Sequence, residues 1–110
     1  MARLDAIQQA SKYAMQIPFR VMEKSLESME VMKAMAGEGL EASVSDAGVG
    51  ALCARTAVMG AFLNVKINAA GVDDKTFVND LLSRGQKIED EANKLELEII
   101  GLVNEKINKQ

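Results

Sequence analysis

Hydrophobic positions recur at helical spacing along almost the whole chain, and no alternating run typical of a strand stands out. The pattern predicts four helices, over Ala2 to Gln16, Pro18 to about Ala36, about Asp46 to Ala69, and about Asp74 to Ile107. The expected fold class is therefore all-α, an elongated bundle of about four helices with a long C-terminal helix. A chain of 110 residues corresponds to one domain, so residues 1–110 are expected to form a single helical domain.

Pro18 is the predicted boundary between the first two helices. Proline has no backbone N–H, and it disfavours helical geometry at the preceding residue, Ile17. It suits the first turn of a new helix, so we expect the second helix to begin there. The core-facing stripe of that helix is expected to be Phe19, Met22, Leu26 and Met29.

Glycines and short polar residues mark the remaining boundaries. Gly37 and Gly39 are expected to end the second helix, and Gly39 to Val44 has the composition of a short loop. Asp46 is then in position to cap the third helix, next to Ser45 or in a capping box with Ser43. Gly71 is expected to end that helix, and Asp73-Asp74 to cap the last one.

The last two predicted helices differ in their patterns. The third is apolar almost all round, which is typical of a central helix or of one covered by a partner. The fourth has a seven-residue repeat formed by Leu81, Gly85, Ile88, Ala92, Leu95, Ile99 and Leu102. Its ~34 residues would reach about 50 Å, far beyond a compact globule of this size, so we expect a multimer.

Composition excludes several kinds of function. The formal net charge of −3 and the scarcity of aromatic residues argue against a nucleic-acid platform. The absence of His excludes histidine-based catalysis and histidine zinc sites. No apolar run reaches the length of a membrane span and no signal peptide stands out, so the expectation is a cytoplasmic protein without a membrane partner.

One helical face of the third predicted helix carries the candidate chemistry. Its residues, spaced three or four apart, are Asp46, Gly50, Cys53, Ala57, Gly60, Asn64 and Asn68. Small residues on one face permit either a close helix crossing or a shallow groove for a flat ligand, and both alternatives stay open. Cys53 is expected to be a buried, inert thiol.

Two cations, Arg55 and Lys66, share a second face of the same helix. They are equally suited to bind an acidic ligand and to form ion pairs with the acidic residues of this chain or of a partner.

Two segments of this region resemble a known family. Ser43-Val-Ser45-Asp46-Ala-Gly-Val and Gly60-Ala-Phe-Leu-Asn64-Val-Lys-Ile-Asn68 are similar to the cyclodeaminase/cyclohydrolase family of folate enzymes. The upstream Ala6-Ile-Gln-Gln-Ala10 and Ile17-Pro18 fit the same family. The resemblance extends over nearly the whole chain and corresponds to the C-terminal half of the cyclodeaminase domain.

The resemblance implies a reaction and a set of site residues. The reaction is cyclodeamination of 5-formiminotetrahydrofolate to 5,10-methenyltetrahydrofolate with release of ammonia, and histidine breakdown is the implied pathway. Asp46 is the expected catalytic residue, stabilising positive charge or relaying a proton. The expected substrate-binding residues are Ser45, Asn64, Asn68, Arg55 and Lys66. A tetrahydrofolate derivative is the substrate, no metal or other cofactor is implied, and a homodimer or larger homo-oligomer is expected.

The sequence departs from this family at two points. The glycine-rich segment of the family's N-terminal half has no counterpart here, and Gly39-Leu40 stands where the family usually has Gly-Asn. Two alternatives therefore remain: a methenyltetrahydrofolate cyclohydrolase, and a non-catalytic helical assembly fragment of the same family.

Overall fold

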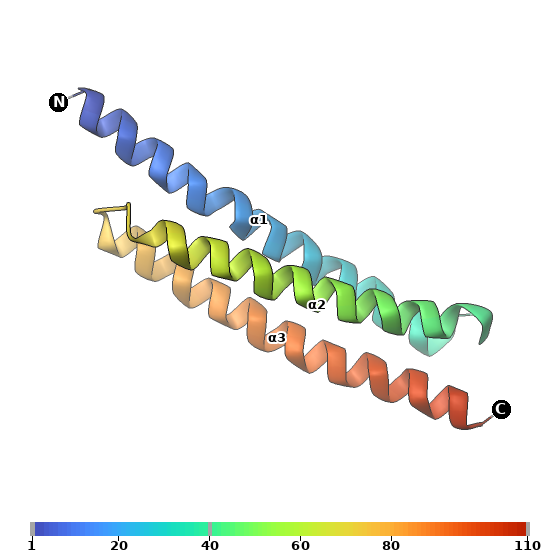
Figure 1. Cartoon of the computed structure of the whole chain (residues 1–110). Coiled ribbons are helices and arrows are strands. Elements are labelled where there is room, and N and C mark those ends of the chain that lie inside the picture. Colours follow the sequence, from blue (N-terminus) through green and yellow to red (C-terminus); the bar gives the residue numbers. More distant parts are fainter. Residues whose placement is uncertain (1, 40, 110) are drawn as a thin grey trace.

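The computed structural model describes residues 2–39 and 41–109, and they form three long helices (Figure 1). The helices are α1 (Ala2–Glu38), α2 (Glu41–Ala69) and α3 (Lys75–Asn108). α1 and α3 run in the same direction, and α2 runs against them (Figure 1). Within the described residues there is no strand, which confirms the all-α prediction, but the helices number three rather than about four.

The predicted helix boundary at Pro18 is wrong, because α1 continues through this residue. A proline inside a helix costs about 3 kcal/mol. Met15, Phe19 and Met22 are buried on either side of it and share one face of the helix. Burial of each large apolar side chain contributes about 1.5–3 kcal/mol, so the continuous face outweighs the local penalty.

α2 begins at Glu41, five residues before the predicted start at Asp46. The residues from Glu41 to Val44, expected in a loop, are helical because Val44 packs into the core and is only 2% exposed. Asp46 therefore lies in the second turn of α2 and does not cap it. α1 ends at Glu38, where the N–H of Gly39 donates to the carbonyl of Met35 (2.8 Å), and Leu40 lies outside the described residues.

α3 follows the predicted pattern. Asp74 is its N-cap, and the Oδ1 atom of Asp74 accepts a hydrogen bond from the N–H of Phe77 at 3.1 Å. Its buried residues are Val78, Leu81, Gly85, Ala92, Leu95, Ile99 and Val103. Ile88 and Leu102 pack against the same core, so the seven-residue repeat is confirmed.

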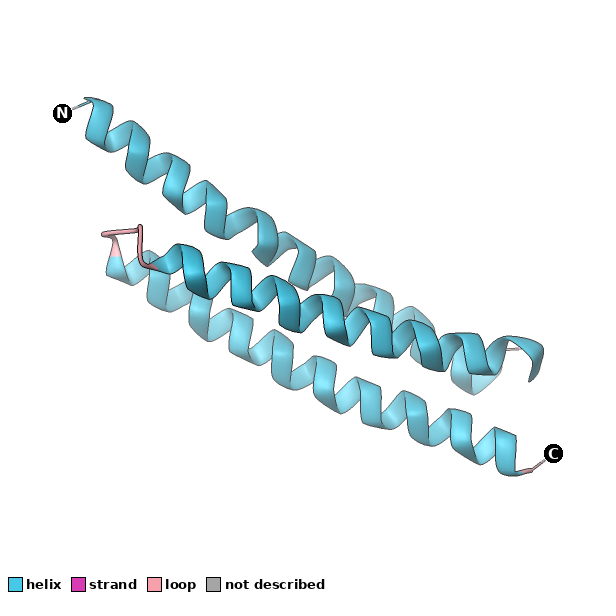
Figure 2. Cartoon of the chain, in the orientation of Figure 1, coloured by secondary structure: helices cyan, strands magenta, loops and turns pink. Residues whose placement is uncertain are grey.

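The bundle is a rod of 66 × 18 × 17 Å with a radius of gyration of 17.6 Å. A compact domain of this length has a radius of gyration near ~13 Å, so the expected elongation is confirmed. Figure 2 shows that one short loop joins α2 to α3 at one end of the rod. Because the rod consists of only three helices, one face of α2 packs in the core and the opposite face is exposed.

The outward face of α2 is apolar. Val49, Leu52, Leu63 and Ile67 are 60%, 43%, 66% and 75% exposed. α2 is long and apolar enough to cross a membrane by length and composition alone, so the expectation that no run reaches this length is wrong. Of its most apolar 18 residues, 39% are buried by the rest of the bundle. Burial on one face explains part of its apolar character, and the outward residues add an exposed apolar surface.

Candidate functional site

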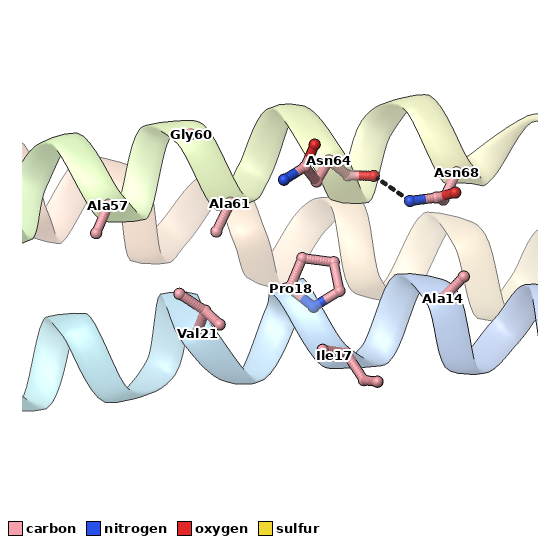
Figure 3. Close-up of a pocket in the computed structure, with 9 residues that line it drawn as sticks. All are labelled: Ala14, Ile17, Pro18, Val21, Ala57, Gly60, Ala61, Asn64 and Asn68. Atoms are coloured by element: carbon pink, nitrogen blue, oxygen red, sulfur yellow. Dashed lines mark hydrogen bonds between the residues drawn. The ribbon is translucent and has the colours of Figure 1, made fainter.

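An open groove lies between the N-terminal half of α1 and the C-terminal half of α2. It has a volume of about 520 Å³, within the range typical of small-molecule sites. Figure 3 shows Pro18 and Val21 of α1 facing α2 across the groove. The complete lining is Ala14, Ile17, Pro18, Val21, Ala57, Gly60, Ala61, Asn64 and Asn68.

A second hollow continues the groove towards the loop between α2 and α3. It shares Ala14 and Asn68 with the first and adds Ile7, Ala10, Ser11, Ile67 and Gly71. Gln8 fixes this end, because its side-chain oxygen accepts from the N–H of Asp73 at 2.9 Å and its amide nitrogen donates to the carbonyl of Gly71 at 3.3 Å. The joined hollows form an apolar trough whose polar groups are concentrated on α2.

The small-residue face of α2 packs closely against α1 at one position and is open to solvent at another. At Gly50 it permits close packing, since an added Cβ would lie 3.1 Å from the sulfur of Met32. Further along, Gly60 is exposed with nothing within 4 Å of an added Cβ. Ala57 and Gly60 therefore form the floor of the groove.

Asn64 and Asn68 are brought together at the groove. The Nδ2 atom of Asn68 donates to the backbone carbonyl of Asn64 at 2.8 Å, one turn earlier (Figure 3). This bond uses one of the two N–H donors of Asn68 and leaves its oxygen free. Asn64 is exposed, so its side-chain amide offers donors and an acceptor on the same wall.

Ser45 and Asp46 are exposed near the other end of α2, outside this groove. Asp46 and Asn64 are 18 residues apart on one straight helix, which corresponds to about 27 Å. Both residues point to the same side, because this separation is about five full turns. Within one chain, however, Asp46 cannot touch a small reacting group held by Asn64.

Arg55 faces α3, where its Nε atom lies 2.7 Å from Oε2 of Glu96 and 2.9 Å from Oδ1 of Asn93. The ion-pair alternative is thus realised within the chain. The ammonium of Lys66 lies 4.2 Å from the ring centre of Phe62, which packs against Gly85 of α3. Neither cation lines the groove that contains Asn64 and Asn68, and their substrate-binding roles stay predictions.

Cys53 is exposed, so the expectation of a buried thiol is wrong. The face that contains it is turned outward along α2 rather than into the core. Across residues 2–39 and 41–109, no group of three or more Cys, Asp or Glu side chains is placed to hold a metal ion.

The α1 wall of the groove was missed as a site by sequence reasoning. Ala14, Ile17, Pro18 and Val21 recur at intervals of three and four residues, which places them on one helical face. That signal was present, but a predicted helix boundary at Pro18 divides the face in two.

Comparisons with known proteins place the chain among folate-related sequences. Residues 1–87 match the family described as formiminotransferase-cyclodeaminase. Over 107 residues the chain is 34% identical to the methenyltetrahydrofolate cyclohydrolase of Methylorubrum extorquens. This match covers 97% of the chain and 51% of that protein, so the chain spans about half the length of the curated relative it matches.

Proposed function

The chain belongs to the formiminotransferase-cyclodeaminase family, and from that premise we propose that it is an enzyme of folate one-carbon metabolism. Its substrate is the 5,10-methenyl form of tetrahydrofolate, in which one carbon bridges two nitrogens and carries a delocalised positive charge. The reaction is hydrolysis of that bridge. The similarity over 97% of the chain to a methenyltetrahydrofolate cyclohydrolase is the observation that carries this proposal.

The groove suits the shape and polarity of a reduced folate. A pterin ring presents N–H donors and ring-nitrogen and carbonyl acceptors along one edge. The amides of Asn64 and Asn68 are able to pair with such an edge, because each offers both a donor and an acceptor. The adjoining aromatic portion of the folate would lie against the apolar wall formed by Ile17, Pro18 and Val21.

Hydrolysis requires a water molecule to attack the bridging carbon. Attack forms a C–O bond, neutralises the cation and leaves a hydroxylated bridge. One C–N bond then breaks and the carbon becomes a formyl group, with one proton released overall. A carboxylate near the carbon accelerates the attack by accepting the proton of the water as the C–O bond forms. Asp46 is the residue proposed for that task, at a site that cannot include Asn64 of the same chain, which lies about 27 Å away along α2.

Cyclodeamination is the second candidate, favoured by the description of the matching family. In that reaction a folate nitrogen attacks the formimino carbon and ammonia leaves. The product is the same bridged cation. The same amides and carboxylate would therefore serve both reactions, which differ in whether water attacks the bridge or ammonia is expelled from it.

The proposal is tested by assaying the purified chain on both substrates. Loss of the methenyl chromophore above the buffer rate would support hydrolysis, and ammonia release from 5-formiminotetrahydrofolate would support cyclodeamination. We expect Asn64→Ala combined with Asn68→Ala to lower kcat/KM at least about tenfold. Asn104→Ala, an exposed amide on α3, is the matched control and should match the wild type. A folded wild-type chain with neither activity would contradict the proposal.

A further inference from the structure

A third hollow lies on α1, directly beside the groove. It has a volume of about 480 Å³ and shares Ile17 and Val21 with the groove. Figure 3 shows the side chain of Val21 directed toward α2 and that of Ile17 directed away from it, so the groove and the hollow meet over these two side chains. The other residues that line the hollow are Tyr13, Arg20, Lys24 and Ser25.

The hollow carries the positive charge that the groove lacks. The lining of the groove contains no charged residue, whereas Arg20 and Lys24 line the hollow, one helical turn apart on the same face of α1. Arg20 is exposed and, among the residues that the structure describes, has no hydrogen-bond or ion-pair partner. Lys24 contacts Glu27 at 3.4 Å, but the two side chains are 79% and 66% exposed, so this pair is weak and another carboxylate can replace Glu27.

The two cations that the sequence offered for an acidic ligand are engaged elsewhere. Arg55 is paired with Glu96, and the ammonium of Lys66 lies over the ring of Phe62. Arg20, in contrast, lies beside the groove with the N–H donors of its guanidinium available.

The spacing of these groups matches the layout of a reduced folate. Its pterin is joined to an aromatic ring, and that ring carries a glutamate with two carboxylates at the far end of the molecule. Ala14 and Asn68 together line both hollows at the start of the groove, so a pterin paired with Asn68 lies beside Ala14 (Figure 3). From Ala14, Arg20 and Lys24 are about 9 and 15 Å further along α1, which is the range that the glutamate of an extended folate reaches.

We propose that Arg20 and Lys24 bind the glutamate carboxylates of the folate substrate, whose aromatic ring crosses Ile17 and Val21. This glutamate site, formed by Arg20 and Lys24, deepens the proposed function and rests on it for the identity of the ligand. The guanidinium of Arg20 presents two parallel N–H groups to one carboxylate, and the ammonium of Lys24 supplies a second positive charge one turn away. Both residues hold the substrate in position and take no part in the bonds that form or break.

A substrate without the glutamate tests the site directly. The N-methylamide of 5,10-methenyltetrahydropteroate keeps the pterin, the bridge, the aromatic ring and an amide, but lacks both glutamate carboxylates. We expect the wild-type KM for this methylamide to be at least about tenfold higher than for 5,10-methenyltetrahydrofolate. Arg20→Gln should raise KM for the folate at least about fivefold with kcat nearly unchanged, and should leave KM for the methylamide unaltered.

Two further variants sharpen the comparison. Arg20→Lys keeps the charge but loses the paired N–H groups, so its KM for the folate should lie between those of the wild type and Arg20→Gln. Arg3→Gln is the matched control, because Arg3 is an exposed arginine of the same helix outside the hollow, and it should match the wild type on both substrates. Equal wild-type KM values for the folate and the methylamide would overturn the glutamate site, as would an equal rise in KM for the folate in Arg3→Gln and Arg20→Gln.

Binding measurements separate this inference from the proposed function. The probes are 5-formyltetrahydrofolate, a stable reduced folate, and its methylamide counterpart, each titrated into the chain by calorimetry. A wild type that turns over neither substrate, but binds the folate more tightly than the methylamide and loses that preference in Arg20→Gln, overturns only the proposed reaction. Turnover of both substrates with equal KM overturns only the glutamate site, and failure to bind either probe overturns both.

Discussion

Phe62 of α2 and position 85 of α3 are in such close contact that only glycine fits at position 85. A Cβ at Gly85 would lie 2.5 Å from Cε1 of Phe62 and 3.0 Å from its Cδ1. Phe62 is 2% exposed, and the ammonium of Lys66 lies over its ring. The ring is therefore confined between Gly85 and the Lys66 ammonium, and this contact limits how closely α2 and α3 approach.

Replacing Gly85 with Ala should destabilise the protein. Alanine would improve helix propensity by about 1 kcal/mol, but a methyl group forced into a packed core costs about 1–3 kcal/mol. At 2.5 Å the overlap is severe. We therefore expect the steric cost to exceed the gain in helix propensity, and the free energy of unfolding to fall by about 1–2 kcal/mol. Urea denaturation at fixed protein concentration measures the change.

Gly101→Ala is the matched control for this substitution. Gly101 is also in α3, but nothing lies within 4 Å of an added Cβ. Only the propensity effect remains there, and stability should rise by about 0.5–1 kcal/mol. Equal effects at positions 85 and 101 would show that Phe62 yields to the methyl group.

The start of α3 should respond to acid. The hydrogen bond from Lys12, followed by that from the N–H of Phe77, holds the pKa of Asp74 below its usual value. A carboxyl with a lowered pKa in the folded state stabilises the fold above its unfolded pKa of about 3.9. That contribution is lost as the pH falls further, through the folded-state pKa. Asp74→Asn should therefore lower Tm at pH 7, and its difference from the wild type should shrink below about pH 4.

Asparagine keeps the ability to cap a helix, so this variant isolates the charge. Asp73→Asn is the control, because only the backbone N–H of Asp73 is bonded, to Gln8. Thermal melts followed by circular dichroism across pH 3–7 measure both variants. A Tm difference for Asp74→Asn that is constant over this range would argue against the Lys12 contact.

Arg55 should contribute to stability through α3. Its contacts with Glu96 and Asn93 are partly shielded from solvent, with side chains of Arg55 and Glu96 34% and 17% exposed. We expect Arg55→Ala to lower unfolding free energy by about 1 kcal/mol, with less effect at high salt. A double-mutant cycle with Glu96→Gln measures the pair. If Arg55→Ala instead raises KM for a folate without changing Tm, its predicted substrate-binding role holds.

Fold class was predictable because it depends on periodicity that each segment displays on its own. The heptad of α3 and the cap at Asp74 need no knowledge of the neighbouring helices. Helix number was not predictable in the same way. Pro18 has a local penalty that the sequence displays, whereas the compensating burial of Met15 and Phe19 depends on α2 and α3.

For the candidate site, the sequence predicted only which residue types share one face of α2. Spacing correctly places Asn64 and Asn68 on the same side of α2, and the structure adds the α1 wall. The 18-residue separation of Asp46 and Asn64 corresponds to about five turns of one helix, so a shared face does not mean a shared site. Spacing could not show that the face containing Cys53 is turned outward, because that depends on which sides α1 and α3 cover.

Pro18 offers the clearest test of whether the groove costs the fold stability. Pro18→Ala restores the hydrogen bond to the carbonyl of Ala14 and removes a penalty of about 3 kcal/mol, against a loss of up to about 1 kcal/mol from a more flexible unfolded chain. Unfolding free energy should therefore rise by about 2 kcal/mol. Val21→Ala removes another part of the same wall. Because Val21 is 45% exposed and alanine has the higher helix propensity, this variant should leave the unfolding free energy nearly unchanged.

Comparing the two variants separates the effect of the apolar groove wall from the effect of Pro18 on the path of α1. If turnover of the folate falls in both, the apolar wall is what the substrate needs, because both shorten it. If turnover falls only in Pro18→Ala while its Tm rises, the proline sets the course of α1 past Asn64, and stability has been given up for that geometry. A Pro18→Ala chain less stable than the wild type would contradict the stability prediction, and would mean that packing of the pyrrolidine ring outweighs the missing hydrogen bond.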